Sequence, residues 1–555
     1  MSDHIAIYVH YICLYICLCI SSCFVLLRVL LDFNTIGESC ITARISTIAF
    51  EGAEARLIDV QVQIAPGKQA FNIVGLADKA VAESRERVRA AFAAIGLRLP
   101  LKRIVVNLAP ADMPKEGAHY DLPIALGLMA IIGAVPMDIL ENFIAIGELS
   151  LDGGIANVAG ALPAAMCASE HGLGLICPYA NGPEAAWAGE LNLLAPENLI
   201  QLLNHFKGSQ ILTRPEAGAL MGVQSTLDLR DVRGQETAKR ALEITAAGGH
   251  NLLMVGPPGS GKSMLAARLS GLLPPLNARE LLETSMVHSI AGLLERGQLS
   301  RNRPFRSPHH SASMAAMVGG GVKAKPGEAS LAHRGVLFLD ELPEFSAQVL
   351  DSLRQPLETG EIHVARVNAH VRYPARFQLI AAMNPCRCGT GGADGVACKR
   401  GVRCAQDYQS RVSGPFMDRI DLQIDVPAVT PADLALPPAK EGTKDVAARI
   451  LAARTLSEAR NGGCTNAELS TQQLDHVAEP DNQGKALLQQ AAETLGLTAR
   501  GYHRTLKVAR TLADLDNCEQ IKRLHIAEAL SHRRTSKDLN SQTPLSSSGK
   551  YLRTR

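Results

Sequence analysis

The sequence predicts a multidomain α/β protein that ends in a helical domain, and three observations indicate this class. Short β-branched runs alternate with amphipathic helical runs over residues 43–204. A glycine-rich phosphate-loop pattern near residue 256 stands between an apolar strand and a helix. Residues 445–534 are rich in Ala, Leu, Glu and Arg. We therefore expect an α+β N-terminal domain, a P-loop α/β domain and a C-terminal helical domain.

Composition limits the classes of function. Of the 555 residues, 47% are hydrophobic and 20% are charged, which excludes a disordered, collagen-like or coiled-coil chain. Lys and Arg number 56 against 54 Asp and Glu, so the whole chain is not a polybasic nucleic-acid binder, although a local basic pore remains allowed. Aromatic residues make up only 4%, which disfavours a stacking platform for single strands.

Changes in composition along the chain predict the domain boundaries. Proline-rich or aperiodic stretches indicate linkers, and the Ser/Thr/Lys-rich end indicates disorder. The predicted segments are a hydrophobic extension at 1–42, the N-terminal domain at 43–204, a linker at 205–227, the P-loop domain at 228–427, a linker at 428–444, the helical domain at 445–534 and a tail at 535–555.

The first residues differ from the rest. Residues 5–27 contain no Asp, Glu, Lys or Arg and are long enough to cross a bilayer as a helix. No positive region precedes them and no small-residue cleavage site follows. A membrane anchor, a buried helix and upstream sequence outside the functional protein all stay open. We favour the last, because the downstream sequence is typical of a cytoplasmic protein.

Within the N-terminal domain the periodicity predicts individual elements. Residues 56–65 alternate as a strand does, and residues 102–110 form a short β-branched strand. Residues 78–96 carry apolar side chains at helical spacing, and residues 122–135 read as a buried helix that is too short to span a membrane.

A complete phosphate-loop pattern predicts a nucleotide site. The apolar run 251–255 precedes it as a buried strand and a helix follows, which is the context the pattern requires. Its glycines let backbone N–H groups approach phosphates at a helix N-terminus. Lys262 is expected to reach the β- and γ-phosphates, and the Ser263 hydroxyl to bind Mg²⁺. The predicted ATP-binding residues are Gly256, Pro257, Pro258, Gly259, Ser260, Gly261, Lys262, Ser263 and Asp340.

Two further strands are expected to end at the same site. The apolar run 335–339 delivers Asp340, which suits the Mg²⁺ shell, and Glu341, which suits polarisation of the attacking water. Acidic pairs are common at strand ends, but not in a domain that also carries a P-loop. The run 379–385 predicts a third short strand that ends in Asn384, whose amide can orient the water against the γ-phosphate. ATP and Mg²⁺ are the predicted ligands.

These residues together resemble an AAA+ ATPase, with Asn384 in the place of the sensor 1 residue. Lys262 and Asp340 stand 78 positions apart, and the excess sequence at 301–328 resembles the helix-2 insertion of the magnesium-chelatase-like branch. Residues 412–427 and 497–515 resemble the same branch.

The resemblance implies roles for three arginines. Arg419 occupies the position of the arginine finger, and Arg500 that of the sensor 2 residue, with Arg504 as the alternative. An exposed surface arginine is the ordinary interpretation of each. A finger acts on the neighbouring subunit, so the resemblance also implies a ring, namely a homo-hexamer.

The N-terminal domain resembles the Lon-protease-like domain that precedes the ATPase in the YifB/ComM family. The matching segments are 70–96, 110–130 and 145–155, and the whole resemblance covers about residues 43–534. His119 and Ala164 stand where the Ser nucleophile and Lys base of a Lon peptidase would be. A nucleophile without its base is not activated, so we expect a binding or assembly module and not a protease.

The family resemblance implies an ATP-dependent ring motor on forked, branched or single-stranded DNA. Its implied role is branch migration in recombination or natural transformation, with recombination proteins as partners. Residues 360–375 independently predict a hairpin, which in this branch faces the pore. Arg366, His370 and Arg372 are its candidate phosphate contacts, and a solvated hairpin tip is the equal alternative.

Four of the 13 cysteines predict a possible metal site. Cys386, Cys388, Cys398 and Cys404 follow Asn384 in a glycine-rich stretch, and four thiolates suit tetrahedral Zn²⁺. A single residue between the first two is tighter than the usual spacing, so a loop without metal stays open.

Four other functions compete with the DNA motor. A magnesium-chelatase-type motor subunit is disfavoured by the Lon-like domain, and a non-DNA remodelling or assembly ATPase is the related alternative. A scaffold without enzymatic activity is disfavoured by the intact Lys262, Asp340 and Glu341. An ATP-dependent protease is disfavoured by the missing Ser–Lys pair.

Overall fold

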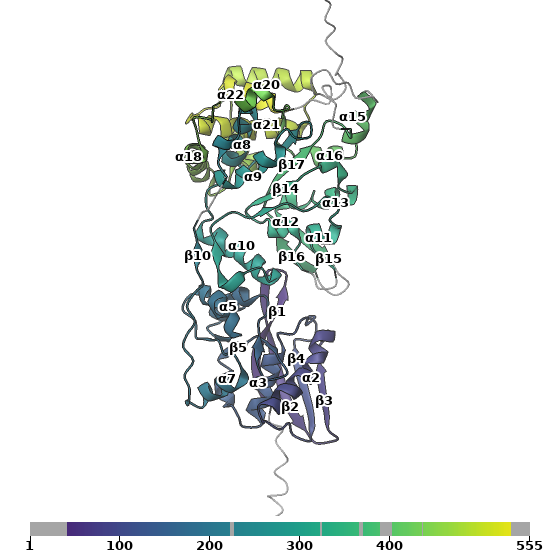
Figure 1. Cartoon of the computed structure of the whole chain (residues 1–555), viewed down its shortest axis with the longest axis vertical. Helices are drawn as coiled ribbons and strands as arrows, with labels where there is room; N and C mark the ends of the chain where they lie inside the picture. Colours follow the sequence, from purple (N-terminus) through teal and green to yellow (C-terminus); the bar gives the residue numbers. More distant parts are fainter. Residues whose placement is uncertain are drawn as a thin grey trace, which may run out of the picture.

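The computed structural model describes residues 42–222, 227–321, 325–365, 370–388, 402–435 and 437–533. The extension predicted at 1–42, apart from its last residue, and the tail at 535–555 lie outside this range, as do Arg366 and Cys398. Figure 1 shows an elongated molecule with the N-terminal sheet at one end, the P-loop sheet in the middle and the C-terminal helices at the other end.

The N-terminal domain is built on a seven-stranded mixed sheet in the order β3-β4-β2-β1-β5-β8-β9. Antiparallel pairing of β1 with β2 forms a long hairpin, and β1 pairs in parallel with β5. The strands are β1 (Thr42–Glu51), β2 (Glu54–Ala65), β3 (Ala70–Val74), β4 (Arg103–Ala109), β5 (Phe143–Ala145), β8 (Gly174–Ile176) and β9 (Leu193–Leu194), with a separate small pair β6 (Glu148–Leu149) and β7 (Ile155–Ala156).

Alternate residues of these strands serve two apolar layers. Val60 and Val62 pack with α2 and α3, whereas Ile48 packs with α5 on the opposite face, as the two-residue period of a strand requires. The helix predicted to reach residue 135 ends at Ile131, because Gly133 adopts a left-handed conformation. The helices are α2 (Lys79–Ala94), α3 (Asp121–Ile131), α4 (Met137–Leu140), α5 (Ala161–Glu170), α6 (Gly182–Ala185) and α7 (Leu199–Phe206).

The central sheet has five parallel strands in the order β13-β14-β17-β11-β18. Val255 at the end of β11 lies opposite Met383 of β17 and Asp425 of β18, so the three strands end at one edge. The strands are β11 (Leu252–Val255), β13 (Phe305–Arg306), β14 (Val336–Leu339), β17 (Gln378–Met383) and β18 (Leu422–Asp425). The bounds predicted from the sequence for β11, β14 and β17 differ from the observed bounds by one or two residues.

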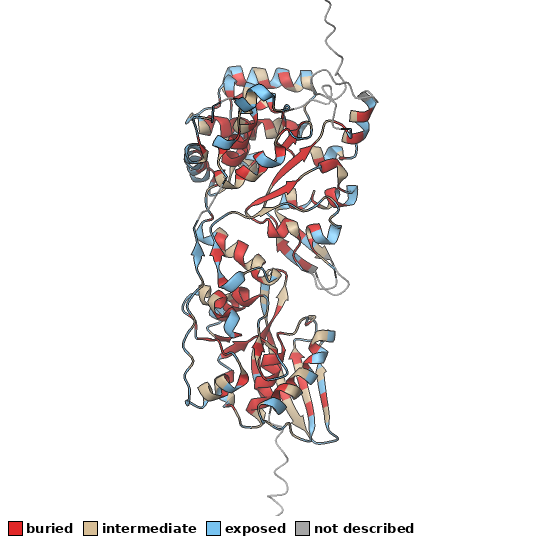
Figure 2. Ribbon diagram, in the orientation of Figure 1, coloured by how far each residue is buried: buried red, intermediate tan, exposed pale blue. Residues whose placement is uncertain are grey.

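The C-terminal helices share their core with this sheet. Leu252 and Met254 pack with α8, α9, α18 and α21, whereas Leu253 and Val255 pack against the other face. In Figure 2 these strands are coloured as buried, as expected of a parallel sheet covered on both sides. The helices are α8 (Glu236–Gly248), α9 (Lys262–Leu272), α17 (Pro431–Ala435), α18 (Thr443–Asn461), α19 (Thr471–Val477), α20 (Asn482–Leu495), α21 (Ala499–Leu515) and α22 (Arg523–Ser531).

The opposite face carries short helices and the loops around them. They are α11 (Met314–Val318), α12 (Glu328–Leu331), α13 (Ala347–Ser352), α14 (Pro356–Thr359), α15 (Val402–Gln409) and α16 (Gly414–Met417). Six short 3₁₀ turns complete the described structure: η1 (Tyr179–Asn181), η2 (Ala186–Ala188), η3 (Leu229–Asp231), η4 (Glu295–Gly297), η5 (Leu342–Glu344) and η6 (Asn466–Glu468).

The insertion between α9 and β14 joins the P-loop sheet to the N-terminal domain. Its helix α10 (Ala278–Ala291) packs on α5 (Figure 1). Ser289 of α10 donates to the buried carboxylate of Glu184 in α6. Trp187 Nε1 donates to the carbonyl of Gly297 at 2.9 Å. The predicted linker at 205–227 contributes β10 (Leu220–Met221), which pairs with β12 (Leu299–Ser300) of the insertion.

The predicted hairpin is present and touches the N-terminal domain. Strands β15 (Glu361–Ala365) and β16 (His370–Pro374) pair antiparallel. Gly52, in the turn between β1 and β2, is so close to this hairpin that an added Cβ would lie 2.0 Å from the Arg372 carbonyl oxygen. Gly52 also has a left-handed φ of +69°, so both packing and backbone conformation require glycine there.

Across the portion of the chain that the structure describes, the helices all lack the combination of length and apolarity needed to cross a bilayer. The run 5–27 lies outside that portion.

Asp421 links the central sheet to the C-terminal helices. It is buried just before β18, accepts the Asn251 N–H at 2.8 Å and pairs with Arg504 of α21. Burial by itself would raise the pKa of Asp421. The charge of Arg504, together with His250 and the Asn251 N–H, outweighs burial and holds this pKa well below its ordinary value.

We predict that Asp421→Ala lowers the free energy of unfolding by about 3 kcal/mol at pH 7, because it leaves the partly buried Arg504 without its anion. A carboxylate with a lowered folded-state pKa contributes its full stability above the unfolded pKa and loses it as pH falls. The gap between wild type and variant should therefore shrink below about pH 4. Guanidinium denaturation followed by circular dichroism measures it. Asp475→Asn, on the exposed face of α19, is the control, and an unchanged gap at low pH would contradict the ion pair.

Candidate nucleotide-binding site

The phosphate loop follows β11 at the carboxyl edge of the central sheet. Gly256 admits no side chain, because a Cβ there would lie 2.1 Å from the carbonyl oxygen of Val426. Gly261 has a φ of +87° and caps α9, which begins at Lys262. The loop thus presents backbone N–H groups at a helix N-terminus, where phosphate binds favourably.

Lys262 and Asn384 come together beside the loop. Lys262 Nζ donates to the carbonyl oxygens of Gly256 at 2.8 Å and Pro257 at 2.9 Å, and lies 3.3 Å from Asn384 Oδ1. Burial lowers the pKa of Lys262, and the charges of Asp340 and Glu341 partly restore it. An ammonium ion held by neutral oxygens is ready to exchange them for phosphate oxygens.

Ser263 and Asp340 form a site that fits Mg²⁺. The Ser263 hydroxyl donates to Asp340 Oδ2 at 2.6 Å, and Asp340 Oδ1 accepts the Glu341 N–H at 2.9 Å. A hydroxyl and a carboxylate oxygen in contact are two of the oxygen ligands that Mg²⁺ requires, with phosphate oxygens and water as the usual remainder. When bound, the ion would neutralise charge on the β- and γ-phosphates.

Glu341 has an unusual backbone and a partner that the sequence did not reveal. Its φ is +53°, a left-handed conformation that is uncommon for a residue other than glycine and occurs at functional sites. Its half-exposed carboxylate lies 3.6 Å from Nδ1 of His310, which belongs to the insertion. His310 thus restrains the carboxylate predicted to polarise water. The adjacent residues His309 and His310 were the only feature of the insertion sequence that could have indicated this contact.

The three predicted arginines lie at the opposite edge of the sheet. The Arg419 carbonyl accepts Asn251 Nδ2 at 3.0 Å, and Asn251 precedes β11, whereas Gly256 follows it. Five residue steps along an extended strand span about 16 Å. Arg419 is therefore separated by the length of the strand from the phosphate loop of its own chain.

Glu358 brings two of these arginines together. Arg419 is buried and its Nη2 donates to Glu358 Oε1 at 2.6 Å, and Arg500 Nη2 lies 3.4 Å from the same oxygen. Arg500 keeps 58% of its side chain exposed. Arg504 instead pairs with buried Asp421 and donates to the Arg419 carbonyl at 2.9 Å. Its contacts are structural, which leaves Arg500 as the more available of the two sensor 2 candidates.

The predicted DNA-contact residues are only partly within the described structure. Arg372 is exposed on β16 and pairs with Glu361 across the hairpin. For His370 only the backbone is described, and Arg366 lies outside the described residues. Of the four cysteines, the structure brings Cys386, Cys388 and Cys404 together.

The two positions implied for a Ser–Lys peptidase pair, His119 and Ala164, are both buried in the N-terminal domain. His119 is buried, with Nε2 2.9 Å from the Ile48 carbonyl oxygen, and burial lowers its pKa. Ala164 is fully buried in α5. Neither residue offers a hydroxyl or an amine.

Comparison with known proteins covers most of the chain. Residues 228–434 match the family model described as magnesium chelatase, subunit ChlI. Residues 60–181 match the model for subunit ChlI of Mg-chelatase, and residues 440–533 match that for its C-terminal region. Competence protein ComM of Haemophilus influenzae is 43% identical over 488 residues, which span 87% of this chain and 95% of that protein. The chain belongs to the YifB/ComM family.

Other relatives place this family next to magnesium chelatase. The uncharacterized protein YifB of Salmonella typhimurium is 43% identical over 494 residues, spanning 88% of this chain and 97% of that protein. The magnesium-chelatase 38 kDa subunit of Rhodobacter capsulatus is 32% identical over 169 residues, which are 27% of this chain and 48% of that subunit. This YifB/ComM protein accordingly belongs with the magnesium-chelatase-like AAA+ proteins, a family consistent with ATP and Mg²⁺ as ligands of this site.

We predict that Lys262→Ala abolishes ATP binding, because it removes the ammonium group that lies against the phosphate loop. Glu341→Gln should bind ATP normally but lose about 10²–10⁴-fold in turnover, because it removes the base and keeps the shape. A fluorescent ATP analogue measures binding and phosphate release measures turnover. Lys444→Ala, exposed on α18, is the control. Undiminished turnover in Glu341→Gln would refute the assignment of the base.

Proposed function

We propose that this protein is an ATP-driven, ring-forming motor that migrates branched DNA in the cytoplasm, during recombination or natural transformation. One observation carries the proposal: Arg419 and Arg500 lie at the sheet edge opposite the phosphate loop of their own chain. A hydrolytic site that uses them needs a second subunit. The similarity to competence protein ComM of Haemophilus influenzae supports the cellular role.

The charge balance at Glu358 supports an action of both arginines on a neighbour. Two guanidinium groups share one carboxylate oxygen, so the cluster carries excess positive charge. A γ-phosphate of an adjacent subunit would supply the missing negative charge, and its oxygens would accept the donors that Glu358 now holds. Arg500 is exposed and could contact this phosphate without rearrangement, whereas Arg419 would have to exchange Glu358 for the phosphate. Repetition of this head-to-tail contact closes a ring, for which we propose six copies.

The hairpin β15–β16 supports DNA as the substrate. Arg372 keeps 64% of its side chain exposed, and its partner Glu361 competes for it only weakly at the surface. Arg366 and His370 lie in or beside the turn of the same hairpin in the sequence. With a net charge of only +2, the chain would bind DNA through a few local phosphate contacts and not through its whole surface.

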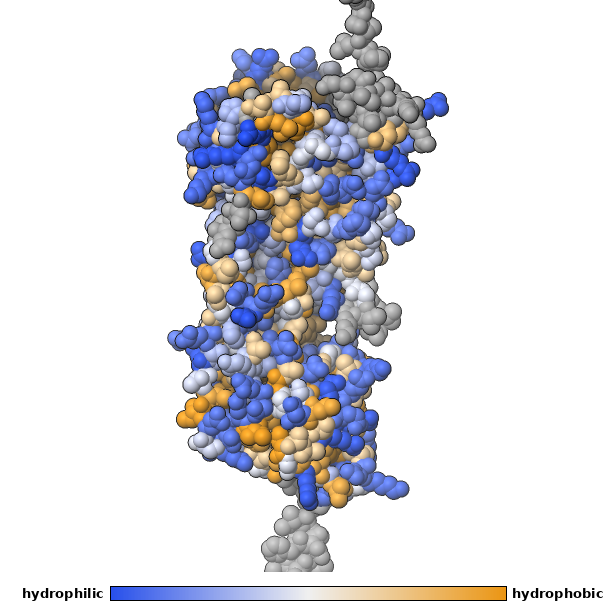
Figure 3. Space-filling model, in the orientation of Figure 1, coloured by the Kyte–Doolittle hydropathy of each residue, from blue (hydrophilic) through white to orange (hydrophobic). Residues whose placement is uncertain are grey.

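We assign assembly to the N-terminal domain, as a Lon-like module without peptidase activity. In the view of Figure 3 apolar side chains gather on the surface of this domain, whereas the other end is mostly hydrophilic. Leu76, Leu101, Leu151 and Ile211 are among the large apolar residues that this domain and its following linker expose. Exposed apolar surface of this kind marks contact with other protein chains, and we propose contacts between copies of this chain, with recombination proteins as further partners.

A second candidate is a motor subunit of the magnesium-chelatase type, and the match with the Rhodobacter capsulatus 38 kDa subunit favours it. That match covers 27% of this chain, whereas ComM and YifB match nearly all of it. ATP-dependent insertion of Mg²⁺ into a porphyrin, measured with the subunits of a known chelatase, separates the two candidates.

We predict that mixing Arg419→Ala chains with Lys262→Ala chains restores part of the ATPase activity that each lacks alone. In randomly mixed rings about a quarter of the interfaces join an intact phosphate loop to an intact Arg419. Arg500→Ala mixed with Lys262→Ala should behave in the same way. Glu341→Gln mixed with Lys262→Ala is the control without rescue, because both defects lie in one site. Absence of rescue for both arginine variants would contradict their action on a neighbour.

We predict that Arg366→Ala with Arg372→Ala weakens binding to forked and four-way DNA equally for unrelated sequences, because phosphate contacts read no bases. The slope of log affinity against log salt should fall by about one for each lost contact. Arg85→Ala, exposed on α2, is the matched control, and light scattering verifies ring formation.

Migration of a labelled four-way junction by the purified protein decides the substrate. We expect movement that requires ATP and stops in Glu341→Gln. A hexameric preparation that hydrolyses ATP but neither binds nor moves forks or junctions would overturn the DNA proposal and favour the chelatase-type or protein-remodelling alternatives.

A further inference from the structure

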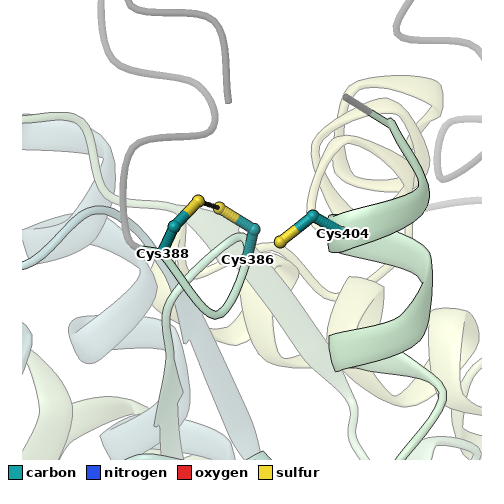
Figure 4. A group of neighbouring side chains, drawn as sticks. All are labelled: Cys386, Cys388 and Cys404. Atoms are coloured by element: carbon teal, nitrogen blue, oxygen red, sulfur yellow. Dashed lines mark hydrogen bonds between the residues drawn. The ribbon is translucent and has the colours of Figure 1, made fainter. Parts of the chain in front are cut away.

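Three cysteines converge beside the end of the strand that carries Asn384. Cys386 and Cys388 lie in the loop that leaves β17, and Cys404 lies in the first turn of α15 (Figure 4). All three sulfur atoms lie within 4.8 Å of one another, and those of Cys386 and Cys388 are 3.0 Å apart. Two segments of the chain thus bring their thiols to one point.

Among the described residues, neither packing in an apolar cluster nor a disulfide between Cys386 and Cys388 accounts for the convergence. Cys386 and Cys404 are 1% and 8% exposed, yet neither joins the apolar clusters formed by the described residues. Cys167 and Cys177, by contrast, are packed into such a cluster in the N-terminal domain. A disulfide requires sulfur atoms about 2.05 Å apart, which is well below the 3.0 Å between Cys386 and Cys388.

We propose that Cys386, Cys388 and Cys404 bind a structural zinc ion. Zinc–thiolate bonds of about 2.3 Å in a tetrahedron place the sulfur atoms about 3.8 Å apart. The observed separations reach that value with shifts of about 1 Å or less. Thiolates are soft ligands that select zinc over magnesium, so this site does not compete with the ATP site for its ion.

Two arginines flank the cysteines in the sequence. Arg387 stands between two of the cysteines and Arg403 precedes the third, and both arginines are exposed. Three thiolates and Zn²⁺ leave a net negative charge, which these guanidinium groups offset. A tetrahedral structural site takes four ligands. Cys398 is the candidate from the sequence for the fourth, but it lies outside the described residues, so the experiment treats it separately.

The ion would fasten α15 to the end of β17. One link between them is already present, since Gln409 Nε2 donates to the Pro385 carbonyl at 2.9 Å. Asn384, which contacts Lys262, is two positions before Cys386. A zinc ion at this place would hold the end of β17 in position, and with it the Asn384 amide of the nucleotide site. The role is structural, and it does not depend on the proposed action on DNA.

The test is the metal content of the purified full-length protein. After expression with added zinc and gel filtration without chelator, elemental analysis should find about one zinc per chain. Cys388→Ala and Cys404→Ala should retain less than about a tenth of it, because the remaining thiols no longer close the site. Cys167→Ala, which truncates a buried cysteine of a helix elsewhere, is the matched control and should keep the full content. A metal-free wild type, or full zinc in both ligand variants, would overturn the proposal.

A second measurement covers the case in which the ligand variants fail to fold. Metal-free wild type titrated with Co²⁺ should develop the charge-transfer absorption of thiolate-bound cobalt, which added Zn²⁺ displaces. Absence of this absorption, or iron or copper in place of zinc in the purified protein, would overturn the assignment. Loss of zinc in Cys398→Ala would support a site of four thiolates, and retention would support three thiolates with a water.

Discussion

The parallel register of β14, β17, β11 and β18 aligns the ends of four strands, and the groups of the nucleotide site take their places from that alignment. Where the strands end, the chain delivers the phosphate loop, Asp340 and Asn384. Where they begin, it gathers three arginines around Glu358 and Asp421. The phosphate loop and the arginine cluster therefore lie at opposite ends of these strands, and the proposed contact between subunits rests on that arrangement.

The sequence alone predicts the position of a residue where a local pattern and a rule of sheet topology act together. The phosphate loop, Asp340 and Asn384 each follow an apolar run, and parallel strands bring such ends to one edge. No such rule distinguishes Arg500 from Arg504 as the sensor 2 candidate. The two lie one turn apart on α21, and only the approach of that helix to β18 decides which one meets Asp421.

Other features depend on contacts that leave no periodic signal. Two-residue strands such as β10 and β12 are too short to alternate, and they pair across a long stretch of sequence. His310 lies in an aperiodic insertion, and its position beside Glu341 follows from how that insertion folds back. The helical C-terminal region was expected from composition, but its shared core with the central sheet becomes visible only when both faces of β11 are traced.

The contact of Gly52 with the Arg372 backbone has a mechanical consequence. At this separation the turn between β1 and β2 and the hairpin β15–β16 meet with no room for a methyl group. Close-packed protein is nearly incompressible, so a push on the hairpin in this direction is transmitted to the N-terminal sheet instead of being absorbed. The N-terminal domain is therefore placed as a brace that resists displacement of the hairpin toward it.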